Sequence, residues 1–226
     1  MSCAEELTKD LERRFRVVSE PLSVGGGTFD ILRPDSADDL ISEEDFVGDE
    51  RLPYWAAIWP ASIVLADELV NGNLSAARSG MRTLELGCGV GVVTTAAMTA
   101  GLDVLATDYY EPALEFTRAN TCRIISREAK TRMVNWRELP SNLGRFDLIL
   151  ASDVIYEREY AGLLPRVFEK LLQFDGHAVI ADPGRVSTPA FLHSCTGLGL
   201  KVHEKKTLPW EQGAVKQKID IYTIGH

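Results

Sequence analysis

Three closely spaced glycines and a later carboxylate are arranged as in a binding site for a nucleoside. Residues 84–91 read Leu-Glu-Leu-Gly-Cys-Gly-Val-Gly, between an apolar run typical of a strand and a run typical of a helix. Because Gly87, Gly89 and Gly91 lack a Cβ, backbone N–H groups can closely approach a ligand at the start of that helix. Asp108 ends the next apolar run, where a carboxylate can bridge the two hydroxyls of a ribose. The pattern predicts a cofactor that contains a nucleoside.

Cofactors of more than one class bind at a glycine-rich turn between a strand and a helix. A turn that binds a dinucleotide has a third small residue three positions after its second glycine, for close packing of the helix on the strand. In this chain that position is Val92, which disfavours a dinucleotide. A different nucleoside-bearing cofactor is therefore favoured.

A second carboxylate stands at the end of another apolar strand. The run 146–152 is followed by Asp153, and Tyr156 comes three positions later. A buried strand that ends at a carboxylate places the charge at the mouth of a site, where ionisable groups are often functional. We interpret Asp153 as a hydrogen-bond acceptor for an incoming amine or for the cofactor. The structural alternative is an N-cap for the following helix.

Aromatic and amide side chains offer surfaces for a flat base and for a cation. Asn135 can pair with the edge of an adenine and Trp136 can cover its face, although an indole can equally fill a core. Trp55 and Trp59 either form a hydrophobic lid on the core or line a channel for an amine, because ring faces attract cations. Tyr109 either borders the nucleoside pocket or simply packs.

The turn after the fifth expected strand of the core holds two further candidates. Asp182 ends that strand and is expected to face the same crevice, and Arg185 follows a Pro-Gly turn. We predict that these side chains orient a substrate. The alternative for Arg185 is a solvated cation on a loop.

Strands and helices alternate along most of the chain. The expected strands cover residues 82–87, 102–107, 131–135, 146–152 and 177–182, and the expected helices cover 61–69, 91–100, 111–122, 158–173 and 188–196. This alternation predicts an α/β fold with a mainly parallel sheet, helices on both faces and a ligand at the carboxyl ends of the first strands. The runs 200–207 and 218–224 predict an antiparallel pair at the sheet edge, joined by a loop that holds Pro209, Trp210 and Gly213.

The chain is expected to be a single domain over residues 1–226, with 1–52 as an arm or cover and 53–226 as the catalytic core. The elements expected in the arm are a helix over 4–14, a β-hairpin with strands over 15–24 and 28–32, and an acidic loop or cover over 34–49.

Composition and charge limit the function classes. The 226 residues are 45% hydrophobic and 25% charged, as in an ordinary globular domain, and the net charge of −9 argues against a nucleic-acid surface. No apolar run approaches the roughly 18 residues of a membrane helix, and the acidic N-terminus does not resemble a secretory signal. The histidines show no metal-ligand spacing, so no metal is predicted. The four cysteines are scattered along the chain, at Cys3, Cys88, Cys122 and Cys195. We interpret them as reduced thiols, which indicates a protein of the cytoplasm.

Five segments of the chain belong together as the motifs of one family. They cover residues 53–60, 84–91, 135–136, 151–156 and 182–185. Together they resemble the seven-β-strand protein lysine methyltransferases, within the class I methyltransferases that use S-adenosyl-L-methionine. The branch they resemble most methylates the β subunit of electron transfer flavoprotein. The resemblance runs from about residue 50 to 185, and the N-terminal hairpin and the C-terminal tail depart from that branch.

The resemblance implies a Rossmann-like fold, S-adenosyl-L-methionine as the methyl donor and S-adenosyl-L-homocysteine as the product. The glycine loop and Glu85 would hold the methionine part of the cofactor, and Asp108 would hold the ribose. Asn135 with Trp136 would hold the adenine. The cofactor-binding residues implied in this way are Trp59, Glu85, Gly87, Cys88, Gly89, Gly91, Asp108, Tyr109, Asn135, Trp136, Ser152 and Asp153.

The activity implied by the resemblance is transfer of methyl groups to lysine side chains of a protein. Asp153 and Tyr156 would be the catalytic residues, and Trp55, Asp182 and Arg185 are the candidates for substrate binding. Two alternatives stay open. The first is a small-molecule N- or O-methyltransferase, because fold does not fix substrate. The second is a cofactor-binding but catalytically silent partner protein. The acceptor, the number of methyl groups added and the oligomeric state are not determined by the sequence.

Overall fold

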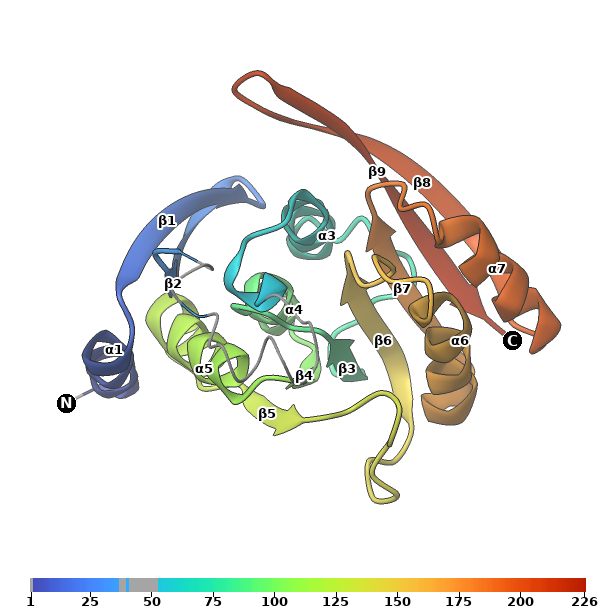
Figure 1. Ribbon diagram of the computed structural model, residues 1–226, viewed down its shortest axis with the longest axis horizontal. Coiled ribbons are helices and arrows are strands. Elements are labelled where there is room, and N and C mark those ends of the chain that lie inside the picture. Colours follow the sequence, from blue (N-terminus) through green and yellow to red (C-terminus); the bar gives the residue numbers. More distant parts are fainter. Residues whose placement is uncertain (1, 37–39, 41–52) are drawn as a thin grey trace.

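A seven-stranded sheet runs through the centre of the molecule (Figure 1). The computed structural model describes residues 2–36, 40 and 53–226. In sheet order the strands are β5 (Lys130–Met133), β4 (Asp103–Asp108), β3 (Arg82–Leu86), β6 (Phe146–Ser152), β7 (Leu172–Asp182), β9 (Val215–Gly225) and β8 (Lys201–Gln212). The pairs between β5 and β7 are parallel, whereas β9 pairs antiparallel with both β7 and β8. The expected mainly parallel sheet with an antiparallel end is confirmed.

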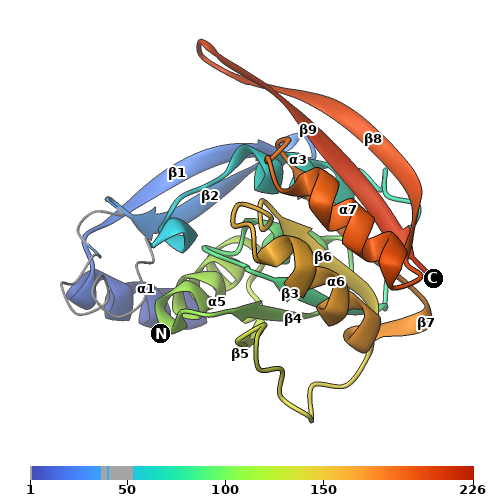
Figure 2. The ribbon, with the colours of Figure 1, turned by 45° about the vertical axis from the view of Figure 1, so that its right-hand side comes forward.

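Helices cover both faces of the sheet (Figure 2). They are α3 (Pro60–Val70), α4 (Val92–Thr99) and α5 (Glu111–Ile125) on one face, and α6 (Tyr160–Leu171) and α7 (Thr188–Gly197) on the other. Strand β6 shows why two cores form. Leu148 and Leu150 belong to the first hydrophobic cluster, while Ile149 and Ala151 belong to the second, because successive side chains of a strand point to opposite faces.

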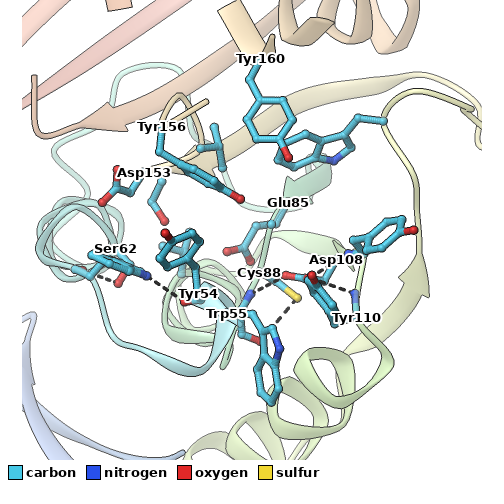
Figure 3. A pocket seen from close by; sticks show the side chains of 18 of the residues that line it. Tyr54, Trp55, Ser62, Glu85, Cys88, Asp108, Tyr110, Asp153, Tyr156 and Tyr160 are labelled. Carbon is cyan, nitrogen blue, oxygen red and sulfur yellow. Dashed lines mark hydrogen bonds between the residues drawn. The ribbon is translucent and has the colours of Figure 1, made fainter. Parts of the chain in front are cut away.

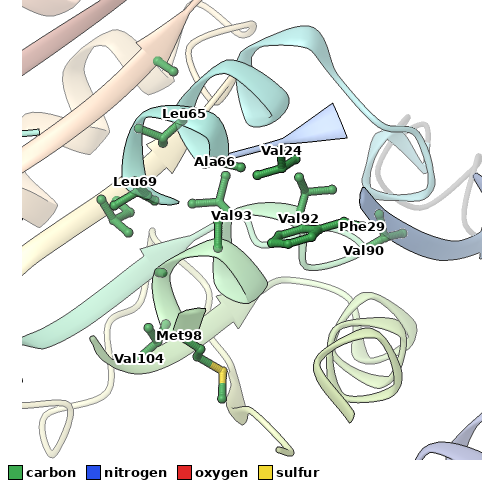
Figure 4. Packing of buried hydrophobic residues seen from close by; sticks show 14 of the residues in the cluster. Val24, Phe29, Leu65, Ala66, Leu69, Val90, Val92, Val93, Met98 and Val104 are labelled. Atoms are coloured by element: carbon green, nitrogen blue, oxygen red, sulfur yellow. The ribbon is translucent and has the colours of Figure 1, made fainter. Parts of the chain in front are cut away.

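The N-terminal arm packs on the α3–α5 face. It consists of α1 (Cys3–Arg14) and a hairpin of β1 (Val17–Val24) and β2 (Gly27–Pro34), as expected. Asn120 on α5 clamps the hairpin: its Oδ1 accepts from Leu32 N at 2.7 Å and its Nδ2 donates to Leu32 O at 2.8 Å. Figure 4 shows Val24 and Phe29 of the hairpin beside Val92 at the start of α4. The arm thereby supports the glycine-rich turn. Most of the acidic segment over 34–49, the expected cover, lies outside the described residues.

The expected loop around Pro209 and Trp210 is wrong. Strand β8 continues through both residues, which pair with Lys218 and Gln217 of β9. Strand β8 lies at the sheet edge, where a proline without an N–H is tolerated. The β8–β9 hairpin therefore projects beyond the rest of the sheet (Figures 1 and 2).

The interpretation of all four cysteines as reduced thiols is also wrong. Cys3 and Cys122 form a disulfide, whereas Cys88 and Cys195 are free and buried. The physical reason is the packing of α1 on α5, which places the two Cα atoms 5.9 Å apart across a sequence separation of 119. A disulfide requires that proximity, and residue spacing does not reveal it.

No helix within the described ranges combines the length and apolar character needed to cross a membrane. The same part of the chain contains no cluster of three or more His, Cys, Asp or Glu side chains that could hold a metal ion.

Candidate active site

A cavity of about 430 Å³ opens at the carboxyl ends of β3, β4 and β6. Its volume lies in the range of small-molecule sites, roughly 300–1,000 Å³. Every site residue predicted from the sequence lines it except Gly91 and Asp182. The predicted residues in the lining are Trp55, Trp59, Glu85, Gly87, Cys88, Gly89, Asp108, Tyr109, Asn135, Trp136, Ser152, Asp153, Tyr156 and Arg185.

The glycines of the turn between β3 and α4 serve two different needs. Gly87 and Gly89 have φ of +70° and +53° and border the cavity. A Cβ on Gly89 would lie 3.1 Å from the backbone oxygen of Trp55. Gly91, at φ +85°, is required by packing: a Cβ there would approach the Cα of Thr117 on α5 to 2.8 Å. The structure therefore assigns Gly91 to the contact between α4 and α5.

Asp108 is held in one orientation at the end of β4. Its Oδ2 accepts from the backbone N–H of Gly89 at 3.0 Å, and its Oδ1 accepts from Tyr109 N at 2.8 Å and Tyr110 N at 3.2 Å. Burial raises the pKa of this carboxyl, and the three N–H donors oppose that effect. The result is a rigid hydrogen-bond acceptor at the cavity wall.

Glu85 is a buried carboxyl whose side-chain contact is with a neutral group, the hydroxyl of Thr94, which donates to its Oε2. Burial raises the pKa of Glu85 to about 8, and the charge of Asp108 adds to the effect. An ammonium group that entered the cavity beside Glu85 would favour its ionised form. The arrangement suits a cationic ligand group.

Cys88 lies between these two acids in the chain but offers no reactive thiolate. Burial raises its pKa well above the ordinary value, and its sulfur accepts from the hydroxyl of Thr117 at 3.4 Å. Its position fits a small packing residue.

A row of aromatic rings forms the opposite wall of the cavity (Figure 3). Each ring meets the next edge-on, with centroids 5.2–6.1 Å apart. Along the row the rings belong to Trp59, Tyr54, Tyr156, Tyr160 and Trp136. Aromatic walls of this kind bind flat bases and cations. The two interpretations of Trp136, core packing and a place in the binding site, are compatible, since it packs against the second core cluster and also lines the cavity.

Asp153 lies one residue beyond β6, with φ of +54° and a side chain that is 3% exposed. Its carboxylate forms a bidentate ion pair with Arg185: Nε donates to Oδ1 at 2.7 Å and Nη2 donates to Oδ2 at 2.8 Å. The N-cap residue of α6 is Glu159, so the capping alternative for Asp153 does not hold. The carboxylate instead stays at the cavity wall.

Asp182 lies beneath the cavity and does not line it. Its Oδ2 accepts from the backbone N–H of Gly184 at 2.9 Å, from Arg185 N at 3.1 Å and from Thr188 Oγ1 at 2.7 Å. These bonds shape the turn that carries Arg185. The sequence predicted that Asp182 and Arg185 both orient a substrate, but in the structure only Arg185 lines the cavity.

Several lining residues were not predicted from the sequence, among them Tyr54, Ser62, Tyr160, Arg137 and Glu157. Tyr54 lies within the 53–60 motif, so it was the easiest of these residues to predict from the sequence. Tyr160 is the first residue of α6, where an aromatic reads as part of a helix face packed on the core. Only the tertiary structure turns its ring toward Tyr156.

Comparisons with known sequences point to one family. A family model described as lysine methyltransferase matches residues 43–192. The chain is 36% identical over 133 residues to Protein N-lysine methyltransferase METTL21A of Danio rerio, covering 56% of this chain and 59% of that protein. It is 31% identical over 134 residues to the Electron transfer flavoprotein beta subunit lysine methyltransferase of Danio rerio, covering 59% of this chain and 51% of that protein. The matches therefore span little more than half the length of these relatives.

Comparisons with solved structures show the Rossmann-like methyltransferase fold. TrmN from Thermus thermophilus superposes with a TM-score of 0.58 at 22% identity, over 79% of this chain and 50% of that one. Magnesium protoporphyrin IX methyltransferase (ChlM) from Synechocystis PCC 6803 with bound SAM gives a TM-score of 0.60 at 14% identity, over 84% of this chain and 97% of that one.

Proposed function

Because the chain belongs to the lysine methyltransferase family, we propose that it transfers methyl groups from S-adenosylmethionine to lysine side chains of a protein. The proposal rests on one observation: a single cavity has two halves whose side chains differ in chemistry. One half holds Glu85 and Asp108, and the other holds Asp153 beside the aromatic row. The first half suits a nucleoside with an aminoacid end, and the second suits an amine acceptor.

The residues present fit S-adenosylmethionine. Gly87 and Gly89 leave open the space that side chains would fill, next to Trp136 on one side and Trp55 on the other. The buried carboxyl of Glu85 would face the α-ammonium of the cofactor, and Asp108 would accept from the ribose hydroxyls. Asn135 and Trp136 are proposed for the adenine, with Tyr109, Ser152 and Cys88 completing the lining.

When bound, the cofactor supplies a methyl group on a sulfonium, and the C–S bonding electrons return to sulfur as the new N–C bond forms. The protein must align a neutral amine with that bond. Correct orientation alone supplies roughly 7–11 kcal/mol of barrier reduction. Asp153 would accept a hydrogen bond from the acceptor nitrogen and so point its lone pair along the cavity, which requires geometry rather than basicity.

The aromatic wall favours the neutral form of the acceptor. A lysine side chain that enters between the rings loses water, and desolvation lowers the pKa of an amine. Burial raises the pKa of Tyr156, so its hydroxyl stays protonated and adds no negative charge. The proton released from the ammonium leaves to solvent before the transfer.

Three further points belong to the proposal. A small-molecule acceptor is the alternative, because the fold of the solved relatives fixes no substrate. A catalytically silent partner protein is the second alternative, which the intact Asp153 and Tyr156 disfavour. We propose the cytoplasm as the compartment.

The test is a transfer assay with methyl-labelled S-adenosylmethionine and a soluble cell extract as the source of acceptors. Wild-type protein, Asp153→Ala and the exposed-site control Asp175→Ala are compared, and the products are separated into protein and small-molecule fractions. We expect a labelled protein band with wild type and the control, and at least a hundredfold less label with Asp153→Ala. The labelled lysine is then located by peptide mass analysis.

Two results would change the assignment. Label confined to the small-molecule fraction would favour the small-molecule alternative. Equal labelling by Asp153→Ala would remove Asp153 from the mechanism. Binding of S-adenosylhomocysteine, measured by calorimetry for all three proteins, shows whether a silent variant still holds the cofactor.

A further inference from the structure

The carboxylate proposed to receive the acceptor amine already has a cationic partner. Both oxygens of Asp153 are bonded to Arg185, at 2.7 and 2.8 Å, in the parallel two-bond geometry that guanidinium and carboxylate groups prefer. The guanidinium carbon also lies 5.7 Å from the ring centre of Trp59. Arg185 therefore touches the two groups that would otherwise attract a lysine ammonium.

Arg185 is fixed from both of its ends. Its backbone N–H is held by Asp182, which also holds Gly184 and Thr188 and so shapes the turn. Its guanidinium is held by Asp153, and that bond raises the pKa of Arg185 further, so it stays charged. Asp153 is buried while Arg185 is partly exposed, and loss of the partner of a buried charge is unfavourable. A single ammonium cannot reproduce the two parallel bonds, so an incoming lysine does not displace Arg185.

Two lone-pair positions of Asp153 remain available after the bidentate pair has formed, because an ionised carboxylate has about four such positions. The acceptor nitrogen thus meets a hydrogen-bond acceptor whose charge is already compensated. A bare carboxylate would have the opposite effect, since an opposite charge within about 4–6 Å stabilises the ammonium form by roughly 1–3 pKa units.

Other ionisable groups face the same space, and their charges bear on the acceptor. They are Tyr54 from the 53–59 segment, Tyr156 and Glu157 from the β6–α6 loop, Tyr160 from α6, and Glu85, Cys88, Asp108, Tyr109, Tyr110 and Arg137 around the rest of the cavity, while Asp182 of β7 acts on Arg185 from outside the cavity lining. Burial raises the pKa values of Cys88 and Tyr156, which keeps these two groups neutral around pH 7, and the carboxyl of Glu85 would be paired with the α-ammonium of a bound cofactor. Asp153 is thus the carboxylate whose compensation matters most where the amine binds.

We propose that Arg185 is a positioning residue that cancels the charge of Asp153, so that the carboxylate directs the acceptor nitrogen while the acceptor binds as a neutral amine. This inference rests on the proposed function. It replaces direct substrate binding by Arg185, which the sequence suggested, with an action through Asp153. In the transfer, the amine lone pair would form the N–C bond and the C–S bonding pair would return to the cofactor's sulfur, which leaves the positive charge on the methylated nitrogen.

The test uses sinefungin, which carries a primary amine where S-adenosylmethionine carries its methylated sulfur. Its affinity is measured by calorimetry against that of S-adenosylhomocysteine, which lacks this amine. Because both ligands share the aminoacid end that faces Glu85, the ratio of the two affinities cancels the titration of Glu85. The ratio therefore reports how the site treats a positive charge at the transfer position. Measurements run from pH 6.5 to pH 10.5.

We expect Arg185→Gln to raise the preference for sinefungin at pH 7 by about tenfold or more, the equivalent of one pKa unit. The increase should vanish at high pH, where the amine is neutral. Arg185→Lys keeps the charge but not the two parallel bonds, so it should raise this preference less than Arg185→Gln does. The double variant Asp153→Asn/Arg185→Gln restores a neutral pair and should return close to the wild-type ratio.

A purely structural role would not produce this pattern. An unchanged ratio in a folded Arg185→Gln protein, judged by its thermal unfolding curve, would overturn the inference. So would a double variant that behaves like Arg185→Gln alone. If wild type binds neither ligand, the proposed cofactor site itself fails and the inference fails with it.

Discussion

Acidification should weaken cofactor binding through one residue, Glu85. Its pKa is raised to about 8 by burial, so around pH 7 its carboxyl is mostly protonated when the cavity is empty. An α-ammonium placed beside it would lower that pKa by about 1–3 units. Binding must then release a proton, and the affinity must fall as the pH falls.

The size of the effect follows from the two pKa values. Between pH 7.5 and pH 5.5 the affinity for S-adenosylhomocysteine should fall on the order of tenfold, because one pKa unit corresponds to a tenfold change in the equilibrium. This window lies below the ordinary pKa of the ligand's α-amino group, about 8, so most of the ligand stays charged throughout. The sign is set by the empty protein: it binds the proton, and the complex does not.

Titration calorimetry measures both parts of this prediction. Affinities are determined at several pH values, and enthalpies are compared in two buffers with different heats of ionisation to count the released protons. Glu85→Gln should bind weakly at every pH and release no proton. Thr94→Val removes the hydroxyl that favours the ionised form of Glu85. At pH 7 it should therefore bind the ligand more weakly than wild type does. Constant wild-type affinity over the window, with no proton release, would refute the reasoning.

Three more predictions concern the scaffold and the ribose site. Gly91→Ala should lower the free energy of urea unfolding by about 2–4 kcal/mol, because its φ is left-handed and the added Cβ would overpack against α5. Gly80→Ala is the control: its φ is +83° but an added Cβ would have no atom within 4 Å, so the loss should be only about 1–2 kcal/mol. Cys3→Ser should lose about 2–4 kcal/mol of stability under oxidising conditions and little when a thiol reductant has already opened the bond to Cys122; equal losses in both conditions would contradict this. Asp108→Asn should weaken S-adenosylhomocysteine binding at least tenfold in calorimetry, since an uncharged amide is a weaker acceptor for ribose hydroxyls.

Much of the fold was predictable because it depends on local patterns. Apolar runs of strand length alternate with helical periodicity, so both the parallel part of the sheet and the positions of most helices followed from the residues. Strand β6 was expected over 146–152 and forms over that range. The C-terminal hairpin was less predictable, because proline is excluded from a central strand but allowed in the edge strand β8, and edge position is a property of the whole sheet.

The residues of the candidate site were also predictable only in part. Residues that end strands, such as Asp108 and Asp153, were found because the carboxyl ends of parallel strands meet at one edge. Tyr160 was not found, since an aromatic at the start of a helix looks the same whether it faces a core or a cavity.

The sequence by itself determined which chemical groups this protein can bring to a site: a glycine turn free of Cβ atoms, acids at strand ends, and indoles in a short segment. The tertiary structure alone decided which of these groups are charged and what they touch. The pairing of Asp153 with Arg185, the burial of Glu85 near the charge of Asp108 and the disulfide between Cys3 and Cys122 join residues far apart in the chain. Hydrogen bonds, ion pairs and desolvation act over a few ångströms, and only folding brings such residues within that distance.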